Sequence, residues 1–158
     1  MVREGENAPD FTAPLANGDI ERFTLSEQLG DGPIVLAFFP GAFSSVCTGE
    51  MRTFRDRMDA YEEVGATVYG VSVDSPFALN AFREDSDLGF SFISDANREI
   101  IKKYDVSMDF DELGLSEFAG RAVFVIDDKG TITYAWVGEP RTEPDYEAVE
   151  SAAADAAA

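Results

Sequence analysis

Short apolar runs bounded by turn-forming residues alternate along this chain with segments of helical periodicity. Three of the runs, residues 34–39, 67–73 and 122–126, are almost continuously apolar. Runs of this length without regular polar positions are typical of strands buried on both faces of a sheet. A fourth run, residues 131–137, alternates more, and a turn at 127–130 joins it to the third. We therefore expect a hairpin in which the fourth strand pairs antiparallel with the third.

Helical periodicity occupies the segments between these runs. The clearest case begins after the serines at 44–45 and ends at Gly65. Its apolar positions recur at intervals of three and four, and they are Cys47, Met51, Phe54, Met58, Tyr61 and Val64. This spacing predicts one amphipathic helix with Cys47 in its first turn and a glycine at its end.

Further signals complete the expected fold. Ser75-Pro76 predicts the start of another helix, and shorter helices are expected over residues 97–104 and 145–158. An Asn-Gly-Asp turn at 17–19 predicts a β-hairpin near the N-terminus. Strands that alternate with helices indicate a layered α/β fold with a central mixed sheet. Because no repeat, charge block or linker interrupts the first 140 residues, we expect a single domain over residues 1–158.

The chain is strongly acidic, with 31 acidic and 12 basic side chains and a formal net charge of −19. This charge repels nucleic acid phosphates, whose binding needs clustered Lys and Arg, so we expect no nucleic acid partner. The acidic residues are spread along the whole chain, as in halophilic proteins, whose surface repulsion is screened by salt. The pattern favours a salt-rich cytoplasm, and an ordinary acidic protein is the alternative.

Neither a membrane segment nor a metal site is expected. No apolar stretch approaches the roughly 20 residues that span a bilayer, and the first residues lack the apolar region of a secretory signal. We therefore expect a cytoplasmic protein without a membrane partner. A single cysteine excludes an internal disulfide, and a chain without histidine has no ordinary ligand set for zinc, copper or haem. We expect no cofactor.

The candidate reactive group is Cys47, which opens a predicted helix after a buried strand and a loop broken by Pro40. A helix N-terminus presents unpaired N–H groups and the positive end of the helix dipole, so a cysteine there ionises more readily than free cysteine. Pro40 can hold the loop over the sulfur, and Ser44 can present its hydroxyl to the sulfur or to a bound oxygen. The plainer interpretations are a core cysteine, a proline that ends a strand and a serine that caps a helix.

The spacing of Pro40, Ser44 and Cys47 resembles the peroxiredoxin signature: proline, three residues, threonine or serine, two residues, cysteine. The segment 120–127 resembles the stretch that carries the active-site arginine of peroxiredoxins, which implies that role for Arg121. Other segments are similar to the family in order and spacing, namely residues 5–11, 70–75 and 93–106. The resemblance covers nearly the whole chain and implies a thioredoxin-like fold.

Within the family, residues 39–50 look most like the short, one-cysteine alkyl hydroperoxide reductase E branch. The resemblance implies a thiol-dependent peroxidase, in which the Cys47 thiolate attacks hydrogen peroxide or an organic hydroperoxide and becomes a sulfenic acid. Arg121 would stabilise the anionic sulfur and the departing oxygen. One variety of two-cysteine relative has its second thiol where this chain has Arg52. Because this chain has no second cysteine, reduction would need an external thiol or redoxin protein. Such relatives commonly dimerise, which implies a homodimer.

Alternatives remain open at this point. A peroxide sensor would oxidise at Cys47 and pass the signal to a partner, and a redox-inert thioredoxin-like domain would have an unreactive thiol. Arg121 could form an ion pair at a strand edge. The aromatic residues Phe38, Phe39 and Phe43 are expected to be core and pocket wall, with a dedicated substrate reader as the alternative, and their apolar character suits organic hydroperoxides. Glu50 is a candidate anchor for Ser44 or Arg121.

Overall fold

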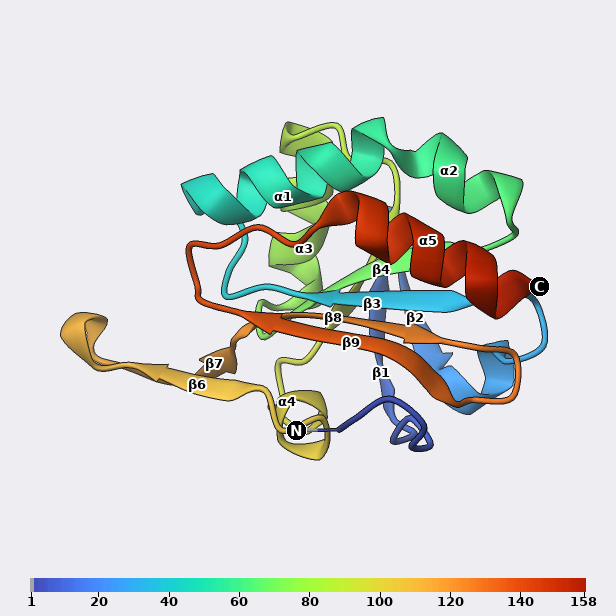
Figure 1. The fold of residues 1–158 in the computed structure, drawn as a ribbon. Helices are drawn as coiled ribbons and strands as arrows, with labels where there is room; N and C mark the ends of the chain where they lie inside the picture. Colours follow the sequence, from blue (N-terminus) through green and yellow to red (C-terminus); the bar gives the residue numbers. More distant parts are fainter. Residues whose placement is uncertain (1) are drawn as a thin grey trace.

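The computed structural model describes residues 2–158, which form a mixed β-sheet covered by helices on both faces (Figure 1). The sheet has seven strands in the order β2-β1-β5-β4-β3-β8-β9. Their bounds are β1 Thr12–Ala16, β2 Ile20–Thr24, β3 Ile34–Phe38, β4 Thr67–Ser72, β5 Ser91–Ser94, β8 Arg121–Ile126 and β9 Ile132–Gly138. The mixed sheet, the antiparallel β8–β9 pair and the N-terminal β1–β2 hairpin confirm the predicted α/β architecture.

The helices lie in two layers. Helices α1, α2, α3 and α5 cover one face of the sheet, while α4 and the N-terminal segment lie on the other (Figure 1). Their bounds, with two 3-10 turns, are η1 Leu25–Gln28, α1 Ser45–Asp56, α2 Met58–Glu63, α3 Pro76–Asp85, α4 Ile100–Lys103, η2 Asp111–Leu113 and α5 Tyr146–Ala157. No helix within residues 2–158 has the length and apolar character needed to cross a membrane.

The central strands are apolar on both sides because each face of the sheet has its own core. In β3, Val35 and Ala37 belong to the core under α1, α2, α3 and α5. Leu36 and Phe38 of the same strand belong to the core on the α4 side. All four side chains are fully buried, which explains why this run shows no alternation of apolar and polar residues.

The direction of β8 brings distant parts of the chain together. β3 runs parallel to β4 but antiparallel to β8, and Phe38 at the end of β3 lies opposite Ala122 near the start of β8. The loop that leaves β3 therefore lies beside Arg121, the first residue of β8. This register places Arg121 next to the start of α1, although the two segments are far apart in sequence.

The helix predicted to continue to Gly65 is instead two helices, α1 and α2, separated at Arg57. Arg57 has φ −105° and ψ 12°, and the hydrogen bond from Ala60 N–H to its carbonyl has the spacing of a tighter turn. Its guanidinium pairs with Glu150 of α5. Apolar spacing continues through the break and could not reveal it.

Helix α4 begins at Ile100 rather than at residue 97. The carboxylate of Asp95 accepts hydrogen bonds from the backbone N–H groups of Glu99, Ile100 and Ile101 at 2.9–3.0 Å. These bonds satisfy amides that a helix start leaves unpaired, so the helix starts here. The predicted starts of α3 and α5 are confirmed, each with a side chain that caps the first turn.

Three strands carry no clear sequence signal: β5, β6 (Ser107–Phe110) and β7 (Leu115–Ala119). β5 is only four residues long. β6 and β7 form a separate two-stranded hairpin, joined by η2, that projects from the body of the protein (Figure 1). Most of its side chains are exposed or half-buried, so no apolar run marks it.

Candidate active site

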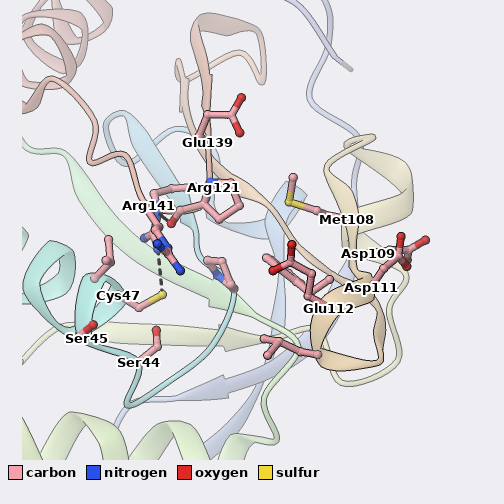
Figure 2. A pocket seen from close by; sticks show the side chains of 15 residues that line it. Ser44, Ser45, Cys47, Met108, Asp109, Asp111, Glu112, Arg121, Glu139 and Arg141 are labelled. Atoms are coloured by element: carbon pink, nitrogen blue, oxygen red, sulfur yellow. Dashed lines mark hydrogen bonds between the residues drawn. The ribbon is translucent and has the colours of Figure 1, made fainter.

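Cys47 is the third residue of α1, and its sulfur lies beside the guanidinium of Arg121. Arg121 Nη2 donates a hydrogen bond to Cys47 Sγ over 3.1 Å (Figure 2). Each of the two side chains has an exposed fraction of 1%. Where water is excluded, a guanidinium stabilises an anionic sulfur far more than it does in water. The structure therefore brings together the two residues that carry most of the expected chemistry.

Two further hydrogen bonds hold the guanidinium of Arg121 in one orientation. Nη1 donates to Glu50 Oε1 over 2.8 Å, and Nε donates to the carbonyl of Pro140 over 2.9 Å. The acceptors belong to α1 and to the loop after β9, so the planar fork is fixed from several sides. Arg121 also forms an ion pair with Glu50, but this pair is buried and β8 lies between β3 and β9, so it is not the ion pair at a strand edge that was the alternative.

Glu50 lies one turn after Cys47 on α1 and is fully buried. Burial raises the pKa of its carboxyl from 4.5 to about 7, because the cost of removing the charge from water outweighs the attraction of Arg121. Among the described residues, its Oε2 atom has no hydrogen-bond partner. Of the two anchoring roles considered for Glu50, the structure selects the contact with Arg121.

A cavity of about 900 Å³ lies next to Cys47, within the size range of small-molecule sites. Pro40, Ser44, Cys47 and Arg121 line one side of it. The β6–β7 hairpin lines the other side and contributes Met108, Asp109, Phe110, Asp111, Glu112 and Leu113 (Figure 2). The loop after β9 adds Glu139, Pro140 and Arg141. The buried sulfur therefore faces an open space.

Ser44 lies at the cavity, but its hydroxyl bonds to the loop backbone and not to the sulfur of Cys47. The hydroxyl donates to the carbonyl of Gly41 over 3.0 Å, and in the described part of the chain it makes no hydrogen bond to the sulfur. The Ser44 carbonyl accepts from the backbone N–H and the hydroxyl of Thr48, at 2.9 and 2.8 Å. Ser44 occupies the N-cap position of α1 without a capping bond from its side chain. Its hydroxyl therefore shapes the loop.

The three aromatic residues near the site differ in position. Phe38 and Phe39 are fully buried, as expected for the core. Phe43 is 54% exposed, has a left-handed φ of 69°, and packs edge-on against the ring of Phe82. It does not line the cavity, so its predicted role as a pocket wall is wrong. The apolar lining comes from the β6–β7 hairpin instead.

Sequence reasoning missed the hairpin side of the cavity because β6 and β7 lack an apolar pattern. It also missed Asp74, whose carboxylate accepts a hydrogen bond from the backbone N–H of Ala42 over 2.8 Å. A carboxylate directly after a buried strand was the available signal, since such positions lie at the edge of a sheet. In residues 2–158, no three His, Cys, Asp or Glu side chains are grouped so that they could hold a metal ion.

Comparison with known proteins supports the resemblance. Residues 5–135 match the AhpC/TSA family. The chloroplastic 2-cysteine peroxiredoxin of Chattonella marina var. antiqua is 35% identical over 144 residues, which cover 86% of this chain and 71% of the relative. The putative peroxiredoxin bcp of Coxiella burnetii is 31% identical over 137 residues, which cover 85% and 88% of the two chains. The relatives include a two-cysteine protein, so they do not decide the branch.

The fold comparison agrees with the sequence match. The crystal structure of peroxidoxin BcpB from Mycobacterium tuberculosis aligns with a TM-score of 0.81 at 29% identity, and the alignment covers 98% of this chain and 96% of that one. The 2-Cys peroxiredoxin of Plasmodium vivax in its reduced form aligns with a TM-score of 0.84 at 23% identity, over 95% and 79% of the chains. The thioredoxin-like fold is thereby confirmed. The chain belongs to the AhpC/TSA family and is a peroxiredoxin, a thiol peroxidase that reduces peroxide with electrons from a thiol.

Proposed function

We propose that Cys47 is the peroxidatic residue of a one-cysteine peroxidase similar to the alkyl hydroperoxide reductase E branch, with Pro40, Ser44 and Arg121 as its site partners. The observation that carries this proposal is the 3.1 Å hydrogen bond from Arg121 to the Cys47 sulfur at the wall of a cavity. A buried sulfur next to a cation and an open space is arranged for reaction with a small molecule.

In the first step the thiolate of Cys47 attacks one oxygen of a hydroperoxide, and an S–O bond forms as the O–O bond breaks. The departing oxygen takes up a proton and leaves as water or an alcohol, and the sulfur becomes a sulfenic acid. Arg121 stabilises the negative charge that develops on the departing oxygen. The Ser44 hydroxyl donates its hydrogen bond to the Gly41 carbonyl, so its oxygen can accept a hydrogen bond from the peroxide O–H.

The second half of the cycle uses an external thiol, because Cys47 is the only cysteine in the chain. The thiol condenses with the sulfenic acid, releases water and leaves a mixed disulfide. A second thiol attacks the outer sulfur, which returns Cys47 as a thiolate and releases an external disulfide. Met108, Phe110 and Leu113 give the cavity an apolar side that suits organic hydroperoxides as well as hydrogen peroxide.

Multiple-turnover peroxide consumption with a supplied thiol tests this cycle. The wild-type protein should consume many equivalents of peroxide, and the matched variant Cys47→Ser should consume none. A peroxide sensor, the competing function, would stop near one equivalent per protein. Activity retained in Cys47→Ser would contradict the proposal outright.

The homodimer, the cytoplasmic location and the adaptation to high salt stay predictions. Phe43 and Phe77, with exposed fractions of 54% and 72%, are apolar side chains that a second copy could cover. Light scattering coupled to size-exclusion chromatography at low and high salt measures the assembly. A monomer under both conditions would remove the dimer from the proposal.

A further inference from the structure

We propose that Asp74 is a positioning residue that holds the active-site loop, residues 39–44, in its reactive conformation. The inference rests on the proposed function, because the loop carries Pro40 and Ser44 to the cavity and leads into the helix that bears Cys47. Asp74 lies just beyond the end of β4 and contacts neither the sulfur nor the cavity in the described residues.

The backbone amides of the loop make few hydrogen bonds to the rest of the fold. In the described part of the chain, two of its amides bond outside the loop: Phe39 N–H to the carbonyl of Val71 over 3.0 Å, and Ala42 N–H to Asp74 Oδ2 over 2.8 Å. Phe39 directly follows β3, so its bond continues the sheet. The bond from Ala42 to Asp74 therefore fixes the part of the loop that leaves the sheet.

The conformation of the loop makes this bond important. Phe43, directly after Ala42, has a φ of 69°, which a bulky side chain rarely adopts without support. Such a conformation persists when surrounding contacts hold it, and it is common near functional sites. The Asp74 carboxylate supplies one of these contacts at the neighbouring peptide group.

Asp74 is itself held rigidly by the ends of two strands. The hydroxyl of Ser72 donates to Asp74 Oδ2 over 2.7 Å, and the hydroxyl of Ser94 donates to the Asp74 carbonyl over 2.6 Å. Both serines are almost completely buried, with exposed fractions of 0% and 1%. The side chain of Asp74 is thus bonded to β4 and its main chain to β5, so both strands fix the position of the acceptor that the loop uses. This network connects the ends of the sheet to the active-site loop without using a catalytic group.

Loss of this acceptor should displace Pro40 and Ser44 relative to the sulfur. A displacement of about 1 Å at an active site lowers rates by up to roughly 10²-fold. We expect Asp74→Ala to slow the oxidation of Cys47 by hydrogen peroxide roughly 10- to 100-fold. Asp74→Asn keeps an oxygen that can accept from both Ala42 and Ser72, so it should restore the rate to within about 3-fold of wild type.

The experiment compares second-order rate constants for single-turnover oxidation by hydrogen peroxide, with thermal unfolding followed on the same samples. The matched control is Ser75→Ala. It removes the side-chain cap that accepts from Ala78 N–H at the start of α3, one residue away, but leaves the loop bond intact. We expect a lower melting temperature without a slower reaction. Because Ser72 orients the carboxylate, Ser72→Ala should slow the reaction by a few fold, and it decides the question if Asp74→Ala does not fold.

The outcomes separate this inference from the proposed function. A wild-type protein that does not react with peroxide defeats the proposed function. A reactive wild type combined with an unimpaired Asp74→Ala, or with Asp74→Asn as slow as Asp74→Ala, overturns the positioning role alone. An equal loss of rate in Ser75→Ala would also overturn it, because general destabilisation would then explain the effect.

Discussion

The wall of the cavity that carries the sulfur is buried and closely hydrogen-bonded, whereas the wall formed by the β6–β7 hairpin is exposed. Cys47, Glu50 and Arg121 each have an exposed fraction of 1% or less, and Arg121 is fixed by three acceptors. Leu113 at the end of the hairpin is 72% exposed, and the hairpin projects beyond the sheet (Figure 1).

The difference suits the two walls to different roles, the buried wall to the chemical step and the hairpin to substrate selection. Stabilisation of a developing charge needs donors held in place before the reaction, and a buried network supplies them. An exposed hairpin can change sequence without disturbing the core, so it can tune what enters the cavity. Substitutions in the buried wall should therefore affect the chemical step, and substitutions in the hairpin should affect selection between substrates.

The largest effect is expected from Arg121→Ala. The variant removes the donor to the sulfur and leaves Glu50 buried without its partner, so oxidation by hydrogen peroxide should slow by about 10³-fold. Arg121→Lys retains the charge but not the fork of donors, so its oxidation rate should lie between those of the wild type and Arg121→Ala. Stopped-flow kinetics at one pH measure both variants. An Arg121→Ala protein within about 10-fold of wild type would mean that the buried wall does not control the chemical step.

Glu50 should make stability depend on pH in a defined window. Its pKa rises from 4.5 to about 7 on folding, so the folded protein holds this proton more tightly than the unfolded chain does. The contribution of the protonated Glu50 carboxyl to the free energy of unfolding is fully present below pH 4.5, and it is lost as the pH rises through about 7. Glu50→Gln cannot ionise and should lack this loss, worth up to about 3 kcal/mol.

Urea unfolding of wild type and Glu50→Gln between pH 4 and pH 8 tests this expectation. The difference between the two proteins isolates Glu50, because the other carboxylates are common to both. The free energies of unfolding should diverge as the pH rises, with Glu50→Gln becoming relatively more stable. Parallel curves would show that burial does not raise the pKa of this carboxyl.

A smaller effect is expected from the apolar part of the hairpin. Leu113→Ser reduces the apolar surface on the far side of the cavity without opening the core, because Leu113 is mostly exposed. The KM for cumene hydroperoxide should rise by about 3-fold, since part of one aliphatic contact is lost. The rate with hydrogen peroxide should stay the same and serves as the internal control. An equal effect on both peroxides would assign the hairpin to the chemical step.

The smallest effect concerns the acidic side chains of the hairpin. Asp111 and Glu112 line the cavity that Cys47 also lines, so an anionic thiol should reduce the sulfenic acid more slowly than its intrinsic reactivity allows. In the double variant Asp111→Asn/Glu112→Gln, the rate with 3-mercaptopropionate should rise by about 2- to 3-fold relative to that with cysteamine. High salt should abolish the change. A ratio that does not change at low salt would exclude charge selection by the hairpin.

The difference between the two walls also explains how much of the site could be predicted. Cys47 at a helix start, Pro40 in the preceding loop and the strands buried on both faces are local features, and periodicity with turn residues indicates them. Arg121 was identified through resemblance to a family, because spacing along the chain does not relate it to Cys47. The role expected for Phe43 failed because its left-handed backbone turns the ring away from the cavity toward Phe82.

By itself, the sequence determined the order of most strands and helices and singled out one candidate sulfur, since these follow from local patterns and from a count of one cysteine. Only the tertiary structure decided that Glu50 contacts Arg121, that Asp74 accepts a hydrogen bond from the loop after β3 and that the hairpin lines the cavity. These contacts depend on strand register and direction, which bring together residues that no local period connects.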